Sequence, residues 1–302
     1  MNLALIGYGE VGRILAEDLR AAGHAVRAFD VKLQSHAAPA LRAHARAHGV
    51  ALADSHANAV RQAELVVSAV TASQTVAAAQ ACAAGLLEGS FFLDLNSASP
   101  GAKIEAAEHV DRGGGHYVEG AVMTAVPPHR IEVPLLVGGP HAGAVMPLLQ
   151  DLGFSAKVAS GRLGVASATK MCRSVMIKGL EAMVLESFTA ARHYGVEEEL
   201  LASLRETFPG LDWEKQASYF FQRVIEHGRR RAEELREAAV TVRAAGLASW
   251  SASATAERQA WVSALADEGV FGPRGVPTFA RSPDWRIEAD RILEHGRVSE
   301  EG

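Results

Sequence analysis

Short apolar runs alternate with amphipathic stretches through the first 160 residues. Four runs of strand length are each followed by a helix-compatible segment, and they cover residues 3–6, 25–29, 65–70 and 91–95. Two further strand candidates, 117–122 and 134–137, precede a helix near 142–152 and a short strand around 156–158. Strands that alternate with helices in this way predict a parallel sheet with helices on its faces.

From about residue 163 the hydrophobic period becomes helical, and no strand pattern follows. The first predicted helix, 163–194, is apolar around much of its circumference, at Met171, Val175, Met176, Ile177, Leu180, Met183, Val184 and Leu185. Such a helix needs to be covered by other structure, so we expect a homodimer. Further helices are predicted over 213–226 and 229–245, and irregular structure over 269–283.

Length and composition are those of a soluble globular protein with two domains. Of the 302 residues, 48% are hydrophobic and 22% charged, and the formal net charge of -5 predicts no nucleic-acid or membrane partner. No apolar run has the length of a membrane span, and no signal peptide precedes the first strand, so a cytoplasmic protein is expected. Cys82 and Cys172 lie in apolar, helix-like runs and are predicted to be small buried hydrophobes.

A glycine-rich segment, Gly7-Tyr8-Gly9-Glu10-Val11-Gly12, directly follows the first strand candidate and opens a helix. It matches G-x-G-x-x-G in the context where that pattern predicts a dinucleotide site. Gly7 permits the tight turn, Gly9 lets the backbone approach a pyrophosphate, and Gly12 lets the helix pack closely. The phosphates would lie at the helix N-terminus, where unpaired N–H groups favour negative charge.

Asp30 ends the second strand candidate, where a carboxylate accepts hydrogen bonds from the adenosine ribose and repels a 2′-phosphate. The cofactor is therefore predicted to be NAD, with NADP possible because Lys32 could offset part of that repulsion. The alternative is a plain strand-to-helix turn followed by a surface acid, but the complete combination favours the dinucleotide. Residues 1–160 are thus predicted to form a Rossmann-type, doubly wound α/β domain, and 161–302 an all-α substrate and dimerisation domain.

Two further segments carry a family resemblance. They are Asp94-Leu95-Asn96-Ser97-Ala98-Ser99-Pro100 and the stretch from Gly161 to Lys170, which reads G-x-x-G-x-x-x-x-x-K. With the glycine turn, they resemble the motifs of the 3-hydroxyacid dehydrogenase and 6-phosphogluconate dehydrogenase superfamily. The resemblance covers essentially the whole chain in order and spacing and is loose outside these motifs.

The resemblance implies that Lys170 is the general base in alcohol oxidation and the proton donor in carbonyl reduction. The reaction itself also requires a general acid or base. Nicotinamide transfers only a hydride, so the hydroxyl proton must pass to a side chain. A partly buried lysine can have its pKa lowered toward working pH. The alternative is a lysine that extends to solvent from the helix start.

The resemblance also implies substrate-binding roles, with two departures from the family pattern. Asn96, Ser97 and Thr124 are expected to orient the substrate, although the segment 117–125 lacks the family's Ser-Gly-Gly turn and has Glu119 in place of its Asp. After the lysine, the usual amide or His-Asn pair is replaced. This chain has Arg173 and Ser174 at those positions, and Lys178 follows one turn later. These residues share a helix face with Lys170 and could bind an anionic group of the substrate.

The predicted activity is hydride transfer between a nicotinamide cofactor and a small hydroxy acid or its carbonyl form. Two alternatives stay open: an imine reductase or reductive aminase, and a non-catalytic dinucleotide-binding regulator. The departures look most like a subgroup in which an uncharacterised C-terminal domain is attached to a 6-phosphogluconate dehydrogenase-type NAD domain. That similarity implies a small anionic or polar substrate without naming it.

Other polar clusters have simpler interpretations. The run Arg229-Arg230-Arg231 could grip an anionic substrate or form a solvated helix face beside Glu233 and Glu234. Glu181 and Glu186 are either salt-bridge partners or acid catalysts. No metal site is predicted, because the histidines at 36, 44, 48 and 56 have no carboxylate at metal-ligand spacing.

Overall fold

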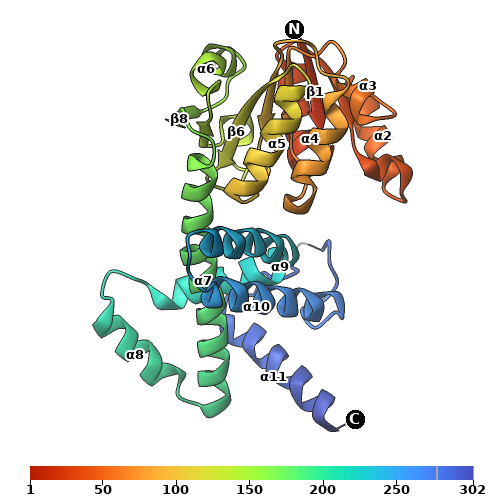
Figure 1. Ribbon diagram of the computed structural model, residues 1–302. Coiled ribbons are helices and arrows are strands. Elements are labelled where there is room, and N and C mark those ends of the chain that lie inside the picture. Colours follow the sequence, from red (N-terminus) through yellow and green to blue (C-terminus); the bar gives the residue numbers. More distant parts are fainter. Residues whose placement is uncertain (277, 302) are drawn as a thin grey trace. The chain divides into compact units, whose positions relative to one another are not determined.

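The computed structural model of the protein describes residues 1–276 and 278–301. The chain divides into two compact units, Met1–Cys172 and Arg173–Gly302 (Figure 1). The division falls inside helix α7 (Val165–Tyr194), which begins in the first unit and continues into the second. The contact boundary therefore lies later than the division at residue 160 expected from the sequence pattern.

The first unit is built on one sheet of eight strands in the order β3-β2-β1-β4-β5-β6-β7-β8. All neighbours are parallel except β6 and β7, which are antiparallel. The two-residue strand β3 was not predicted, since two residues are too short for a periodic pattern. The strands are β1 (Asn2–Ile6), β2 (Ala25–Phe29), β3 (Ala51–Leu52), β4 (Leu65–Ser68), β5 (Phe91–Asp94), β6 (His116–Val122), β7 (Leu135–Gly138) and β8 (Ala156–Ser160).

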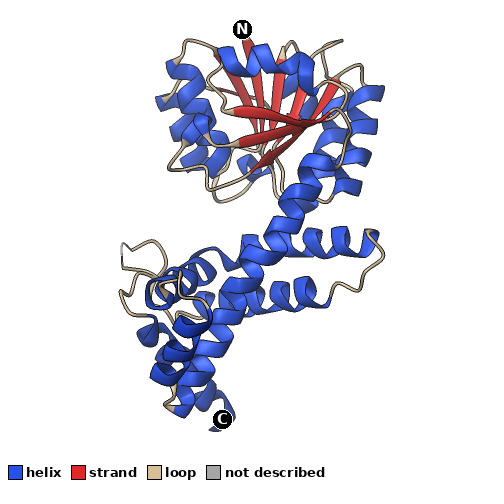
Figure 2. Cartoon of the chain, turned by 90° about the vertical axis from the view of Figure 1, so that its left-hand side faces the viewer, coloured by secondary structure: helices blue, strands red, loops and turns tan. Residues whose placement is uncertain are grey.

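Helices cover both faces of this sheet (Figure 2), which confirms the predicted Rossmann-type fold. Strand order reverses between β1 and β4, so the turns after these two strands flank the crevice where open α/β sheets bind ligands. The helices of this unit before α7 are α1 (Glu10–Ala21), α2 (Ala38–Ala47), α3 (His56–Val60), α4 (Thr75–Ala83), α5 (Pro100–Arg112) and α6 (Ala142–Asp151).

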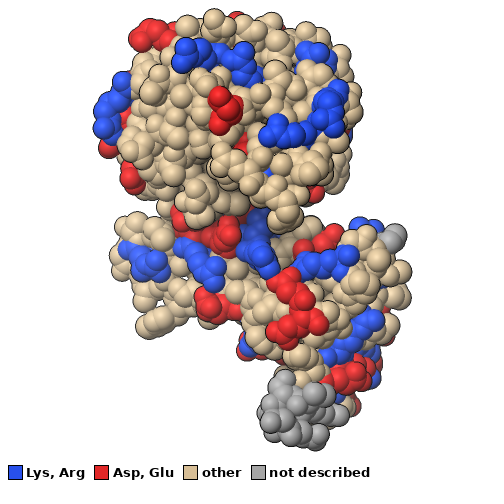
Figure 3. Space-filling view, turned by 90° about the vertical axis from the view of Figure 1, so that its right-hand side faces the viewer, with Lys and Arg blue, Asp and Glu red and all other residues tan. Residues whose placement is uncertain are grey.

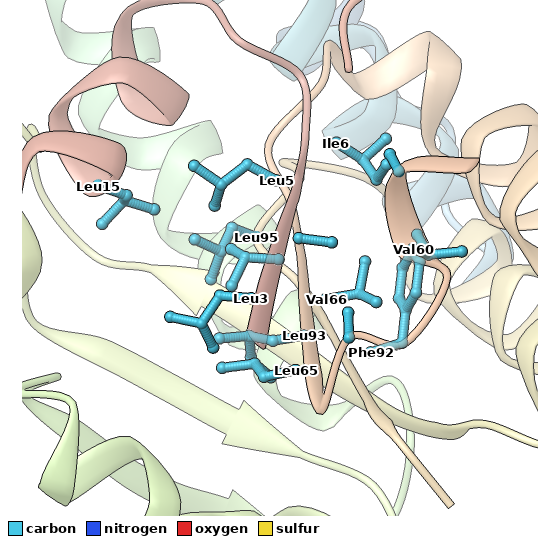
Figure 4. Packing of buried hydrophobic residues seen from close by; sticks show 14 of the residues in the cluster. Leu3, Leu5, Ile6, Leu15, Val60, Leu65, Val66, Phe92, Leu93 and Leu95 are labelled. Carbon is cyan, nitrogen blue, oxygen red and sulfur yellow. The ribbon is translucent and has the colours of Figure 1, made fainter. Parts of the chain in front are cut away.

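The core of the first unit follows from the alternation of side chains along the central strands. Leu3 and Leu5 of β1 point to the face that carries Leu15 of α1 (Figure 4). Val66 of β4 points to the other face, where it meets Phe92 (Figure 4). Each of these fully buried side chains contributes about 1.5–3 kcal/mol to the free energy of unfolding.

The described residues of the second unit form helices and no strand, as predicted, and its core combines aliphatic and aromatic side chains. Phe188 of α7 meets Trp285 with ring centroids 5.0 Å apart, and Phe221 packs on the same indole. The irregular segment expected over 269–283 is confirmed for its described residues. The remaining helices are α8 (Glu197–Thr207), α9 (Trp213–Ala244), α10 (Trp250–Asp267) and α11 (Trp285–Glu301).

Two expectations about helices were wrong. The helices predicted over 213–226 and 229–245 are one continuous helix, α9. Gly228 does not break it; a Cβ there would lie 2.6 Å from the Gln259 carbonyl oxygen, so the glycine serves close packing on α10. Cys172 is exposed although Cys82 is buried, because the apolar run of α7 leaves part of the helix circumference in solvent.

The outer face of α7 has a distinct character. Met176 and Met183 are 72% and 62% exposed, whereas Val184 and Leu185 are buried. Thus only part of the apolar circumference expected for this helix is covered within the chain. None of the helices in the described part of the chain is long and apolar enough to cross a membrane.

Candidate active site

The glycine turn after β1 has the geometry that its sequence demands. Gly7 has a φ of +92°, and a Cβ there would lie 2.4 Å from the carbonyl oxygen of Ala69 in the turn after β4. A Cβ on Gly12 would lie 2.0 Å from the Gly7 carbonyl oxygen. Both glycines are therefore required by the fold, since a larger residue at either would push the turn from the strand ends.

Gly9 differs from its two neighbours because the space beside it is open. Apart from Gly9 itself, its two chain neighbours and the backbone of its own helix, no atom of the described residues lies within 4 Å of a Cβ built there. Gly9 is the N-cap of α1, and no described side chain caps that helix end, so its first N–H groups are left for another acceptor. An open approach to an uncapped helix N-terminus fits a dinucleotide pyrophosphate. Of the other predicted residues, Glu10 is exposed, and Val11 packs against the core.

Asp30 connects the end of β2 to the glycine turn. Its Oδ2 accepts a hydrogen bond from the Tyr8 backbone N–H at 2.7 Å, and its Oδ1 accepts one from the Lys32 N–H at 2.8 Å. The carboxylate is 8% exposed, and each oxygen has a further lone pair for a ribose hydroxyl. The Tyr8 side chain is buried. Of this predicted cofactor-binding residue, it is therefore the backbone that forms part of the glycine turn.

A buried polar network holds the ends of β4, β5 and β6 beside this turn. The Asp94 carboxylate lies 3.0 Å from the Lys103 ammonium and accepts a hydrogen bond from the Tyr117 hydroxyl at 2.7 Å. Burial and the Asp94 charge raise the pKa of Tyr117 well above its usual value, so the hydroxyl stays a donor. Asn96 accepts from the Val70 N–H and donates to Ser68. The Asn96 amide thus positions the strand ends, and its predicted role in orienting substrate stays a prediction.

Lys170 and Ser97 meet at the end of this network. Lys170 Nζ donates to Ser97 Oγ at 2.6 Å, although the two residues are 73 positions apart in the chain. Ser97 follows the Asn96 turn, and Lys170 lies in the second turn of α7, so both belong to the first unit. An amine and a hydroxyl in hydrogen-bond contact can pass a proton to or from a bound polar group.

Glu119 fixes the start of the helix that carries Lys170. Its Oε2 accepts from the Gly164 N–H at 2.9 Å, and its Oε1 accepts from the Ser167 N–H at 2.6 Å. This buried carboxylate of β6 therefore caps α7 and complements the positive end of the helix dipole. Sequence reasoning noted Glu119 only as a family departure, and Lys103 was missed entirely, because neither pairing has a local sequence signal.

The other predicted substrate residues are dispersed. Thr124 and Arg173 are exposed, and Arg173 lies one helical turn after Lys170. Ser174 and Lys178 are buried in the second unit, where Lys178 Nζ pairs with Glu234 at 2.5 Å and contacts the Ser174 hydroxyl at 3.2 Å. Burial lowers the pKa of Lys178, and Glu234 opposes that shift. The ammonium of Lys178, which was predicted to bind substrate, is therefore paired with Glu234 in the structure.

The triple arginine of α9 separates into different environments. Arg231 is buried against Glu181, whereas Arg229 is exposed and pairs with Asp267. Glu186 pairs with Arg258. On the face shown in Figure 3, Lys and Arg side chains of the second unit are interspersed with Asp and Glu. These ion pairs agree with the interpretation of Glu181 and Glu186 as salt-bridge partners. For Arg229 they agree with the interpretation of the arginine run as a solvated helix face.

Two family models match the chain, one in each unit. Residues 2–160 match the family described as the NAD binding domain of 6-phosphogluconate dehydrogenase, and residues 191–262 match the domain of unknown function DUF1932. The solved structure of a conserved hypothetical protein from Sinorhizobium meliloti 1021 is 38% identical, with a TM-score of 0.73 and 96% of each chain covered.

Proteins with named activities are more distant. The 3-hydroxyisobutyrate dehydrogenase of Pseudomonas aeruginosa is 26% identical over 219 residues, which are 70% of this chain and 71% of that protein. An imine reductase from Streptomyces aurantiacus shares the fold at 16% identity and a TM-score of 0.53, over 97% of this chain and 99% of that one. The chain therefore belongs to the 3-hydroxyacid dehydrogenase-like family of NAD(P)-binding dehydrogenases and reductases, with a C-terminal DUF1932 domain.

Proposed function

We propose that this protein is a dehydrogenase or reductase that interconverts a small hydroxy acid and its carbonyl form, with Lys170 as the general acid and base. The hydrogen bond between Lys170 Nζ and Ser97 Oγ carries the proposal. This contact supports the proposal because it joins an amine that can carry the proton to a hydroxyl that follows β5, next to the strand ends proposed to bind the dinucleotide.

The nicotinamide, when bound, exchanges the hydride, and the proton is left to the protein. During oxidation, Lys170 Nζ takes the proton of the substrate hydroxyl, and during reduction it returns that proton to the carbonyl oxygen. Ser97 holds the amine in position, because its hydroxyl accepts from Nζ and can itself donate to the substrate. Glu119 keeps the first turn of α7 in place behind Lys170.

Arg173 is the proposed contact for the substrate's anionic group. It lies three residues after Lys170 on the same helix, and that spacing places the two side chains on one face, about 4.5 Å apart along the axis. Its guanidinium is exposed and can bind a carboxylate through two parallel hydrogen bonds. Replacement of Arg173 by Gln is therefore expected to raise KM for an acid substrate more than it lowers kcat.

NAD is the proposed coenzyme, because Asp30 would lie against a 2′-phosphate. Its carboxylate is held in place by the Tyr8 and Lys32 backbone N–H groups, so it cannot swing away from an added negative charge. We expect tighter binding of NADH than of NADPH in calorimetric titrations. Equal affinities would show that Lys32 offsets the repulsion.

The decisive experiment is a substrate screen followed by substitution of the lysine. Short 3-hydroxy acids are offered with NAD and NADP, and cyclic imines with the reduced coenzymes. On the best substrate, Lys170→Ala is expected to lower kcat by about 100-fold or more, the usual contribution of a positioned acid or base, without weakening coenzyme binding. The exposed Lys157→Ala is the matched control.

Each outcome of this screen separates the candidate functions. Turnover of imines but not of hydroxy acids would place the protein with the imine reductases whose fold it shares. Coenzyme binding without turnover of either class would favour a regulator. Near-normal turnover by Lys170→Ala would remove the lysine from the mechanism.

A further inference from the structure

A cluster of metal-ligating side chains lies in the first unit, outside the Lys170 site. It contains Glu17 of α1, with His44 of α2 and His48 at the C-terminal cap of the same helix. Each offers one ligand atom, and these atoms all lie within 4.8 Å of one another. Sequence reasoning dismissed these histidines because Glu17 is far from them along the chain.

Helical spacing brings the two imidazoles together. His44 and His48 are four residues apart, so they lie on one face of α2, one turn from each other. Their rings stack with centroids 4.5 Å apart and planes 28° apart. From the neighbouring helix, Glu17 Oε1 lies 2.9 Å from His44 Nε2, a separation close to that of two ligand atoms on one metal.

The carboxylate of Glu17 can bind a metal through Oε1 and keep its ion pair with Arg130. Its Oε2 accepts a hydrogen bond from Arg130 at 2.7 Å, and its Oε1 contacts the His44 imidazole. Asp18 also pairs with Arg130, and these three side chains together carry one net negative charge. Arg20 also lies nearby, and its guanidinium donates to the backbone carbonyls of His48 and His24.

Tyr8 supplies the group that orients the first imidazole. Its hydroxyl lies 2.9 Å from His44 Nδ1, the ring nitrogen that faces away from Glu17. Histidines that bind metals generally have such a partner on the other ring nitrogen, which fixes the tautomer and the ring direction.

We propose that Glu17, His44 and His48 form a site for a divalent transition metal such as Zn²⁺, completed by solvent. Two imidazole nitrogens and one carboxylate oxygen are a donor set that Zn²⁺ and Co²⁺ accept. Without metal, the Glu17 carboxylate can only accept, so a neutral His44 carries its proton on Nε2 and accepts from Tyr8. With a metal on His44 Nε2, the neutral ring would carry its proton on Nδ1, and this N–H would donate to the Tyr8 hydroxyl oxygen.

The test is a metal titration of the full, untagged chain after chelator treatment. Co²⁺ binding is followed by visible absorbance and Zn²⁺ binding by competition with Co²⁺, and one metal per chain is expected. His48→Ala should weaken binding at least about tenfold, since even loss of a group behind a metal ligand commonly costs 10–100-fold. Because His48 is exposed, this variant is expected to fold normally, which circular dichroism checks.

Control variants locate the site. His36→Ala removes another exposed imidazole of the same unit and should bind metal like the unaltered chain, whereas Glu17→Gln should bind weakly. Zn²⁺ should raise the melting temperature of the unaltered chain and of His36→Ala more than that of His48→Ala. Equal affinity in the His48→Ala variant, or no saturable binding by the unaltered chain, would overturn the proposal.

Discussion

The Lys103 ammonium lies 3.0 Å from Asp94 Oδ1, and both side chains are removed from solvent. Lys103 Nζ also donates to the carbonyl oxygens of Asp94 and Gly120, so one amine joins α5 to the ends of β5 and β6. The strand ends that present Ser97 to Lys170 thus depend on a buried charge pair.

Replacement of Lys103 by Met should be severely destabilising. The change leaves the Asp94 charge buried without a counter-charge, and loss of one partner of such a pair costs about 3–5 kcal/mol of unfolding free energy. Urea denaturation measures this cost. Lys157→Met, on the exposed edge strand, should change the free energy by less than about 0.5 kcal/mol. If Lys103→Met is equally mild, or if adding Asp94→Asn restores none of the loss, the pair is not what holds these strands.

Gly9→Ala should separate coenzyme binding from stability. Gly9 has a φ of -77° and its N-cap conformation suits alanine, so the melting temperature should stay close to that of the unaltered chain. The added methyl group would occupy the space proposed for the pyrophosphate, and NADH affinity measured by fluorescence should fall at least about tenfold, or 1.4 kcal/mol. Gly7→Ala is the comparison, because its positive φ and the 2.4 Å contact with Ala69 should lower stability itself. Unchanged affinity in Gly9→Ala would move the coenzyme away from this turn.

His227 should make the protein sensitive to acid. Burial, together with Arg223, Arg230 and Arg231, lowers the pKa of this imidazole to about 4, against the weaker opposing effect of Glu234. Between pH 6.5 and 4, His227 is therefore protonated in the unfolded chain but neutral in the folded chain. The free energy of unfolding consequently falls as the pH falls through this range.

The measurement is the difference between His227→Gln and the unaltered chain at neutral and acid pH. Between pH 6.5 and 4, the free energy of unfolding of His227→Gln should fall by roughly 2 kcal/mol less than that of the unaltered chain. This difference is smaller than the full pKa shift of His227 would give, because the ring is partly exposed to solvent. His193→Gln, which removes an exposed imidazole of α7, should follow the unaltered chain. Parallel pH profiles for all three proteins would contradict the assignment.

The exposed face of α7 should mediate the expected homodimer. Met176 and Met183 are seven residues apart, which places them on one helix face, and both are mostly exposed. The double substitution Met176→Glu, Met183→Glu should yield monomers in light-scattering measurements without loss of helical circular dichroism. Leu87→Glu introduces one charge at an exposed apolar position of the first unit and should leave the dimer intact. Monomers of the unaltered chain would end this expectation.

The fold and the chemistry-bearing segments were largely predictable because their signals are local. Strand and helix periods located the elements of the sheet, and the glycine spacing after β1 predicted a turn whose close contacts the structure confirms. The family motif also pointed to Lys170, whose catalytic role stays a prediction. These features depend on residues within about one or two turns of each other, where backbone geometry relates sequence spacing directly to position.

The partners of these residues were decided only by the tertiary structure. Glu119 caps α7 from β6, and Lys103 neutralises Asp94 from α5. Glu17 meets His44 across two helices. Buried polar groups must find partners, but sequence spacing does not say which. The sequence by itself determined the Rossmann-type architecture and the turn for the dinucleotide. Tertiary packing decided which charges are buried together, because that choice is made between segments far apart in the chain.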